Sequence, residues 1–210
     1  MCVVATSSMA LTLSFENISA NNVANAAAGE AQLFVEVIDA GSGQVSFRFY
    51  NVGPVASSIA DVYFDDGSLL GIATLVDADD GVGGDPGVDF SQYASPANLP
   101  GANNAVPPFV ATAGFTADSD APAQPNGVNP GEQLIVIFDL QGTQTYADVL
   151  AELDSGALRI GIHVQGFADG GSESFVNNGH DNGVPDGGTT TLLLGMAMLA
   201  LEGLRRKIRK

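Results

Sequence analysis

The sequence predicts an all-β protein: an antiparallel β-sandwich or jelly-roll-like domain with one short helix, followed by a C-terminal transmembrane helix. Short runs of alternating apolar and polar residues recur along residues 11–176, as in strands that are buried on one face. Turn-forming residues separate the runs, and glycine alone accounts for 26 of the 210 residues. With 45 % apolar residues, the chain can bury one core of ordinary size.

The strand-like runs follow one another with clear turn signals between them. Leu11, Leu13 and Phe15 alternate with polar residues in the first run. A Gly-Ser-Gly turn at 41–43 predicts a hairpin, and an Asp-Asp-Gly turn ends the run at 65–67. The predicted strands are residues 11–18, 31–40, 44–53, 58–67, 68–76, 132–140, 157–167 and 172–177.

One stretch has helical spacing instead. Tyr146, Val149, Leu150 and Leu153 lie on one helical face, and Gly156 follows as a C-cap. We expect this helix at the edge of the sandwich. The two sheets are expected to face each other through Phe34, Phe47, Phe49, Phe64, Ile135, Ile137, Ile160 and Ile162.

Residues 77–131 do not fit the strand pattern. They are rich in Gly, Asp, Asn and Pro, and within them residues 106–119 alone indicate a strand. A loop tract of this length is uncommon in a compact domain unless it is functional. We therefore expect a β-sandwich domain over residues 11–176 that carries 77–131 as a long loop tract.

The charge is distributed unevenly along the chain. Residues 1–184 contain two basic residues, Arg48 and Arg159, against 22 acidic ones. This acidic part of the chain, here called the body, repels nucleic acid and anionic lipid, so we expect no nucleic-acid partner. The acidic excess suits an exported or surface protein, or one that collects cations, although solubility alone is the simpler explanation.

Aspartates cluster in the first part of the loop tract. They are Asp77, Asp79, Asp80, Asp85 and Asp89. Calcium prefers oxygen ligands, which a Gly-rich acidic loop can supply. The EF-hand spacing fails, because Asp80 directly follows Asp79 and no glutamate closes the loop. A looser calcium loop, to which 118–120 could contribute, is one hypothesis, and a solvated acidic loop is the other.

The sequence predicts no catalytic centre. Asp65 and Asp66 are adjacent, and neighbours in a strand point to opposite faces, so they would not flank one glycosidic bond. His163 alternates with Ile162 and Val164, which predicts a surface histidine on the polar face of its strand. The G-x-S-x-G, H-E-x-x-H and phosphate-loop motifs are absent from the sequence. We therefore expect a protein that is not an enzyme.

Residues 1–10 allow two interpretations. A short apolar run precedes Ser-Ser-Met-Ala, which has the small residues of a signal-peptide cleavage site. The positively charged start of a signal peptide is missing. The segment is interpreted as the remnant of a truncated signal peptide, and the alternative is an ordinary lead into the first strand.

The last part of the sequence has three segments. Residues 177–188 form a linker rich in Gly, Asn and Asp. The linker ends in Val184, Pro185, Asp186, Gly187 and Gly188. Residues 189–204 form a short apolar helix that Glu202 interrupts, close to the minimum of about 17 residues for a membrane span. Residues 205–210 form a basic stop that favours the cytoplasmic side. A terminal amphipathic helix packed on the domain is the alternative, but the apolar residues leave no polar face.

This arrangement resembles the PEP-CTERM class of bacterial sorting signals, and within it the variant named for its VPDSG motif. The resemblance rests on Val184–Gly188, on the apolar segment, and on the basic stop. The basic stop consists of Arg205, Arg206, Lys207, Arg209 and Lys210. Gly187 stands where the named motif has serine, and Glu202 interrupts a run that is usually free of acids.

The resemblance implies a partner, a route and a destination. The partner would be an exosortase, the membrane-embedded enzyme that reads such signals. The C-terminal helix would hold the protein briefly in the inner membrane. After a cut near the motif, the protein would pass to the cell surface or the extracellular matrix.

The body is then expected to be structural or adhesive. The alternative is a calcium-dependent module that binds carbohydrate, such as an exopolysaccharide. The tyrosines that could line a sugar-binding face are Tyr50, Tyr63, Tyr93 and Tyr146. Because the chain has no tryptophan, such a face would be weak, and ordinary core and edge positions are the preferred interpretation of these residues.

Overall fold

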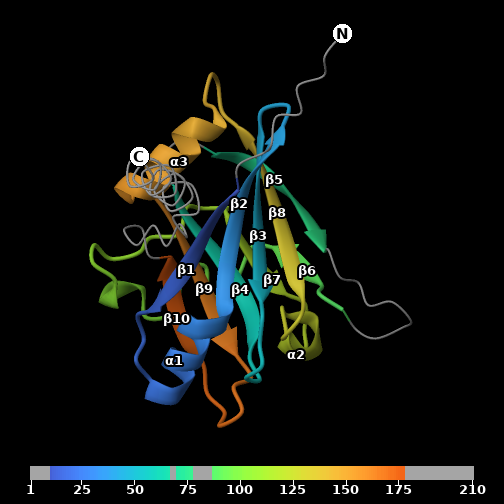
Figure 1. Ribbon diagram of the computed structural model, residues 1–210, viewed down its shortest axis with the longest axis vertical. Coiled ribbons are helices and arrows are strands. Elements are labelled where there is room, and N and C mark those ends of the chain that lie inside the picture. The colour runs from blue at the N-terminus through green and yellow to red at the C-terminus, as the bar shows by residue number, and fades with distance from the viewer. Residues whose placement is uncertain (1–9, 67–69, 78–86, 178–210) are drawn as a thin grey trace, which may run out of the picture.

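The computed structural model describes residues 10–66, 70–77 and 87–177, and over these residues the chain is mostly β, as the sequence predicts (Figure 1). The strands are β1 (Leu11–Asn17), β2 (Leu33–Gly41), β3 (Gln44–Asn51), β4 (Ser58–Asp66), β5 (Leu70–Asp77), β6 (Phe90–Gln92), β7 (Thr116–Ser119), β8 (Gln133–Leu140), β9 (Leu158–Gln165) and β10 (Glu173–Asn177). The helices are α1 (Val23–Gln32), α2 (Ala123–Asn126) and α3 (Tyr146–Ser155), with a 3₁₀ turn η1 at Ala102–Asn104.

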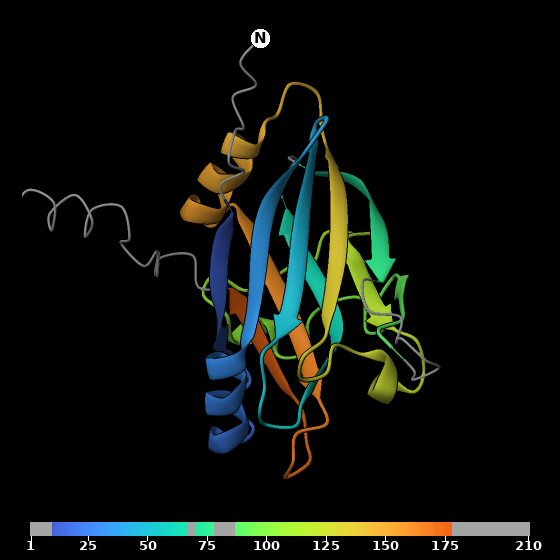
Figure 2. The same ribbon diagram turned by 45° about the vertical axis from the view of Figure 1, so that its right-hand side comes forward.

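The described strands form one antiparallel sheet in the order β5-β8-β3-β2-β1-β10-β9-β4-β7-β6. β1 joins the two halves of this sheet, because its first residues pair with β2 and its last residues pair with β10. At β1 the sheet curls, so that the half containing β2, β3 and β8 faces the half containing β4, β9 and β10 (Figures 1 and 2). The two sheets expected from the sequence are therefore two halves of a single curled sheet.

Aromatic rings fill the space between the two halves. Phe64 of β4 packs edge-on against Phe47 of β3 and Phe138 of β8, with ring centroids 5.0 and 4.7 Å away. Such edge-to-face pairs add to the stabilisation that burial of the rings provides. The inward positions predicted for Phe47, Phe49, Phe64, Ile160 and Ile162 are confirmed, because all of these side chains are buried.

Three predicted core residues were assigned to the wrong face. Phe34, Ile135 and Ile137 are only partly buried and lie on the outer face of the sheet. Their chain neighbours fill the core instead: Leu33, Val35, Leu134, Val136 and Phe138. β2 and β8 carry apolar residues at consecutive positions, so periodicity does not fix their inner face. The register does, because the buried Phe47 pairs with Val136.

α1 is a helix that the sequence analysis did not predict. Asn22 caps it by accepting hydrogen bonds from the N–H groups of Ala24 and Asn25. The helix is rich in alanine and has no regular series of large apolar residues, so it lacks the usual helical pattern. Gly29 allows the helix to approach the sheet closely, since a Cβ atom there would lie 2.2 Å from Cζ of Phe175.

The predicted helix at the edge of the sheet is confirmed as α3. Thr145 and Asp148 form a capping box at its start, and Gly156 ends it in the left-handed region with a φ of 73°. Val149 and Leu153 are its buried residues. The sequence predicted one short helix, whereas the described residues contain a second helix of the same length as α3, namely α1.

The loop tract is more ordered than its composition suggests. Within it, β6 and β7 extend the sheet beyond β4. Residues 93–115, here called the covering loop, lie on the outer face of β4, β9 and β10. Their apolar side chains form a second small core with Tyr63 and Val176. The covering-loop members of that core are Ala94, Leu99, Ala102, Ala105 and Phe109.

None of the helices in the described part of the chain combines the length and the apolar character of a membrane span. The transmembrane helix predicted at 189–204 lies outside the described residues, as do most of residues 1–10.

Candidate functional site

The predicted sorting motif and the basic stop lie outside the described residues, which end at Asn177 in β10. β10 pairs with β1 on one side and with β9 on the other, so it is an interior strand of the sheet. The linker that leads to Val184–Gly188 therefore follows an interior strand of the sheet in the sequence.

The predicted calcium residues are described only in part. Asp77 ends β5, Asp79, Asp80 and Asp85 lie outside the described residues, and Asp89 is exposed. The backbone carbonyl of Asp89 accepts a hydrogen bond of 2.8 Å from the N–H of Asp120. The structure thus brings residues 118–120 beside the end of the acidic loop. Among the described residues, no three His, Cys, Asp or Glu side chains are placed to share a metal ion, and the calcium loop stays a prediction.

Asp65 and Asp66 lie on opposite faces of β4. Asp65 pairs with Arg159 of β9, and Asp66 is buried opposite Leu158. Arg159 also donates hydrogen bonds to the carbonyls of Pro107 and Pro108, at 2.6 and 2.7 Å. This ion pair therefore fastens the covering loop to the sheet, and the two carboxylates do not converge on one point.

Across β7, β4 and β9 the structure assembles a polar row that the sequence analysis did not identify. The register places Asp61 of β4 opposite Asp118 of β7 on one side and opposite His163 of β9 on the other. Directly paired residues share a face, so the three side chains form a row across the outer face. Nδ1 of His163 lies 2.9 Å from Oδ2 of Asp61, and the two side chains are 12 % and 4 % exposed. His163 lies on the predicted face but is mostly buried.

The environment of this acid–histidine row (Asp118, Asp61 and His163) changes its acid–base chemistry. Oδ1 of Asp61 is buried and makes no hydrogen bond of ordinary geometry with the described residues. Burial, the Asp61 charge and a hydrogen bond with Asp61 raise the pKa of Asp118 to about 6. Burial also raises the pKa of Tyr63, whose hydroxyl donates to the carbonyl of Pro96 at 3.2 Å. No sequence motif marks the row, because Asp61 and Asp118 meet only through the β4–β7 register.

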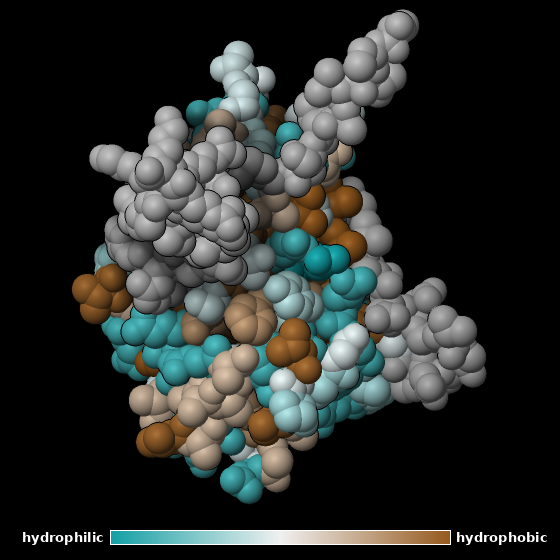
Figure 3. Space-filling model, viewed as in Figure 1, coloured by the Kyte–Doolittle hydropathy of each residue, from teal (hydrophilic) through white to brown (hydrophobic). Residues whose placement is uncertain are grey.

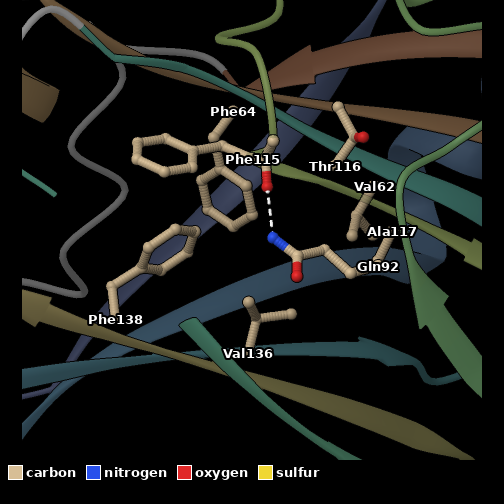
Figure 4. Close-up of a pocket in the computed structure, with 9 residues that line it drawn as sticks. Val62, Phe64, Gln92, Phe115, Thr116, Ala117, Val136 and Phe138 are labelled. Atoms are coloured by element: carbon tan, nitrogen blue, oxygen red, sulfur yellow. Dashed lines mark hydrogen bonds between the residues drawn. The ribbon is translucent and has the colours of Figure 1, made fainter. Parts of the chain in front are cut away.

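A small apolar pocket opens between the two halves of the sheet beside β7 (Figure 4). Phe64, Phe115 and Phe138 gather around it, and the Gln92 amide donates to the carbonyl of Gly114 at 2.7 Å. Its described lining contains no charged side chain. The pocket therefore offers burial to a small apolar group but no acid or base to act on it.

The outer face of β2, β3 and β8, here called the open face, is the side turned to the viewer in Figure 1, with α1 and α3 at its two ends. Phe34 and Tyr50 stack on it, with centroids 5.6 Å apart and planes at 25°. Arg48 pairs with Glu36, and its guanidinium lies 5.8 Å from the centre of the Tyr50 ring. Apolar and polar residues are interspersed over this side of the molecule (Figure 3).

Comparison with known proteins identifies the end of the chain. The family model described as the VPDSG-CTERM motif matches residues 183–208. No curated protein and no solved structure matches the chain. The match contains Val184–Gly188, the apolar segment and most of the basic stop, so the resemblance seen in the sequence is confirmed. The chain carries a C-terminal sorting signal of this kind, which implies export, a cell-surface or extracellular fate, and processing by a sorting enzyme.

Proposed function

We propose that this protein is delivered to the cell surface or the extracellular matrix by an exosortase, which reads and cuts the signal at its C-terminus. The VPDSG-CTERM match at residues 183–208 carries this proposal. Residues 189–204 would hold the protein in the inner membrane only until the cut is made. Sixteen residues with Glu202 among them make a poor permanent anchor, since a stable span needs about 20 apolar residues.

The sequence around the motif suits a membrane-embedded protease. Pro185 disfavours helical geometry at Val184, and Gly187 and Gly188 oppose extension of a helix into the motif. The motif would therefore present an extended peptide at the membrane interface. The basic stop would hold the other end of the apolar segment on the cytoplasmic side.

For the body we propose a structural or adhesive role outside the cell. Acidic residues far outnumber basic ones in it, which favours solubility and resists self-aggregation. The open face combines a stacked aromatic pair with an internally neutralised ion pair, so a neutral surface could approach it without electrostatic repulsion.

Replacing Val184–Gly188 with a Ser/Ala linker tests the sorting proposal. In the native cells, the wild-type protein is expected outside the inner membrane, and the variant is expected to accumulate in the inner-membrane fraction. The matched control replaces residues 178–182, which lie in the same linker but outside the matched motif. If the wild type and the motif variant are found in the same cell fractions, the proposal is contradicted. If the control variant also accumulates in the inner membrane, the linker rather than the motif is recognised.

A second candidate for the body is a calcium-dependent carbohydrate-binding module. The stacked Phe34 and Tyr50 favour it, because their rings offer a partly exposed apolar platform among polar neighbours. The contact between Asp89 and Asp120 also gathers the ends of two acidic segments. The occupant would be a neutral polysaccharide, since the body carries a large negative charge.

Binding to immobilised polysaccharide, with and without calcium, tests this second candidate. Tyr50→Ala is expected to reduce binding at least about tenfold if the ring supplies more than about 1.4 kcal/mol of contact. Tyr93→Ala is the control, because Tyr93 is 68 % exposed but belongs to the covering loop. Unchanged binding by Tyr50→Ala, together with a melting temperature that calcium does not raise, would remove the candidate.

A further inference from the structure

The β4–β7 seam is a narrow attachment. It consists of three register pairs: Asp61–Asp118, Val62–Ala117 and Tyr63–Thr116. β6 is connected to the rest of the sheet through β7, and the covering loop links β6 to β7. The covering loop is also fixed to the sheet through Arg159 and through hydrogen bonds between Thr112 and Asp66, so a change in the seam acts most directly on β7 and β6.

Two carboxylates face each other at one end of this seam. Oδ2 of Asp61 lies 2.9 Å from Nδ1 of His163, whereas the buried Oδ1 makes no hydrogen bond of ordinary geometry with the described residues, although the Tyr63 hydroxyl interacts with the same carboxylate. A buried acceptor without a donor is unfavourable, and two charged carboxylates that face each other repel. A proton on Asp118 removes both costs, because the protonated carboxyl becomes a donor to Asp61.

We propose that Asp118 carries a proton that it donates in a hydrogen bond to Asp61, and that this proton acts as a pH-sensitive latch that holds β7 and β6 on β4. With the proton in place, Asp118 donates to Asp61, and Asp61 accepts from His163 on its other side. Without it, the two carboxylates repel across a seam of three register pairs. The proposal is independent of the sorting signal.

The carboxylates around Asp118 and its burial act in the same direction, and one backbone hydrogen bond opposes them. Burial and the Asp61 charge raise the pKa of Asp118 to about 6, and Asp120 adds to the rise. The backbone N–H of Ser95, in the covering loop, donates to Asp118 and partly offsets it. Tyr63 stays protonated, because burial raises its pKa. His163 contacts Asp61 on the side away from Asp118.

The sign of the pH effect follows from the raised pKa. The usual value for aspartate is 3.8, so the closed seam holds its proton more tightly than the open one. The stabilisation is fully present below about pH 4 and is lost as the pH rises through about 6. Between about pH 5 and about pH 7.5, the equilibrium constant for local opening rises about tenfold.

Hydrogen exchange of the full chain, followed by mass spectrometry at about pH 5 and about pH 7.5, tests the latch. After correction for intrinsic exchange rates, protection of β6 (90–92) and β7 (116–119) in the wild type is expected to fall about tenfold at the higher pH. Asp118→Asn mimics the protonated carboxyl, so its protection is expected to stay high at both values. Asp61→Asn also removes the repulsion and is expected to abolish the pH dependence.

Two controls separate this latch from its alternatives. Asp120→Asn removes an exposed charge outside the pair, and His163→Gln removes the imidazole but keeps a donor, so both variants should retain most of the pH dependence. Loss of the pH dependence in His163→Gln, or its persistence in Asp118→Asn, would overturn the proposal. Recovery of protection at about pH 7.5 on addition of calcium chloride would also overturn it, because the pair would then be a cation site.

Discussion

Phe64 of β4 lies edge-on to Phe138 of β8, with ring centroids 4.7 Å apart and planes at 71°. The two strands belong to opposite halves of the curled sheet, so this pair is a direct link between the halves. Phe64 also contacts Phe47 and Phe49 in the same way. The ring is therefore the centre of the aromatic core on which the packing of the two halves depends.

Truncation of Phe64 should be far more costly than truncation of Phe34. Phe64→Ala is expected to lower the free energy of unfolding by about 3–5 kcal/mol, because it opens a cavity between the halves. Phe34→Ala removes a partly exposed ring from the open face and should cost about 1 kcal/mol. Urea denaturation of the two purified variants and the wild type measures both losses in the free energy of unfolding. Equal losses would show that the faces of β2 are assigned wrongly.

Glu173 fixes residues 17–22 to β10. Its carboxylate accepts hydrogen bonds from the side chains of Asn17 and Ser19 and from the N–H groups of Asn21 and Asn22. Burial raises the pKa of Glu173, but these hydrogen bonds outweigh burial and leave the pKa below its usual value of 4.5. The stabilisation from Glu173 is therefore present above about pH 4.5 and is lost as the pH falls through the lowered value.

Glu173→Gln should therefore destabilise the protein in a pH-dependent way. At about pH 7 the expected loss is about 1–3 kcal/mol, since hydrogen bonds to a buried charge are lost. At about pH 3 the carboxyl lies closer to its lowered pKa and is more protonated than at about pH 7, so the difference between the two proteins should be smaller. Urea denaturation at both pH values measures it. Glu16→Gln removes an exposed charge from β1 and serves as the control; an equal loss in that variant would point to net charge instead.

Gly29→Ala tests the close approach of α1 to the sheet. Alanine favours a helix over glycine by about 1 kcal/mol, so without a contact the substitution would stabilise the protein. The added Cβ would lie 2.2 Å from Cζ of the fully buried Phe175, and a net loss of about 1–3 kcal/mol is expected instead. A raised melting temperature would show that α1 does not pack as described.

The body should resist trypsin. Arg48 and Arg159 are the trypsin sites before residue 205. Both lie inside strands and are paired with Glu36 and Asp65. Native protein is expected to stay uncut at both sites over a time that fully digests the protein in urea, because cleavage requires local opening of the sheet. A native fragment that ends at Arg159 would contradict the observed packing.

Much of the fold could be predicted from the sequence where local signals were strong. The alternation in residues 11–17 and 44–51 identified β1 and β3, and the spacing from Tyr146 to Gly156 identified α3. α1 was missed because its alanines show no amphipathic pattern. β6 was missed because it has three residues and depends on pairing with β7.

The candidate functional residues could likewise be predicted only where they form a local sequence motif. The sorting motif is a local sequence feature and could be recognised from Val184–Gly188 together with the apolar segment and the basic stop that follow it. The acid–histidine row could not be predicted, because Asp61, Asp118 and His163 meet only through strand register. For the same reason Ile135 and Ile137 were placed in the core, although Val136 lies there.

Intact-mass analysis of the wild-type protein recovered from outside the inner membrane is the most direct test of the central claim. If an exosortase removes the signal, this protein lacks the apolar segment and Arg205–Lys210 and ends near Val184–Gly188. A surface protein whose mass still includes Arg205–Lys210 would contradict removal of the signal, and with it the proposed route through an exosortase.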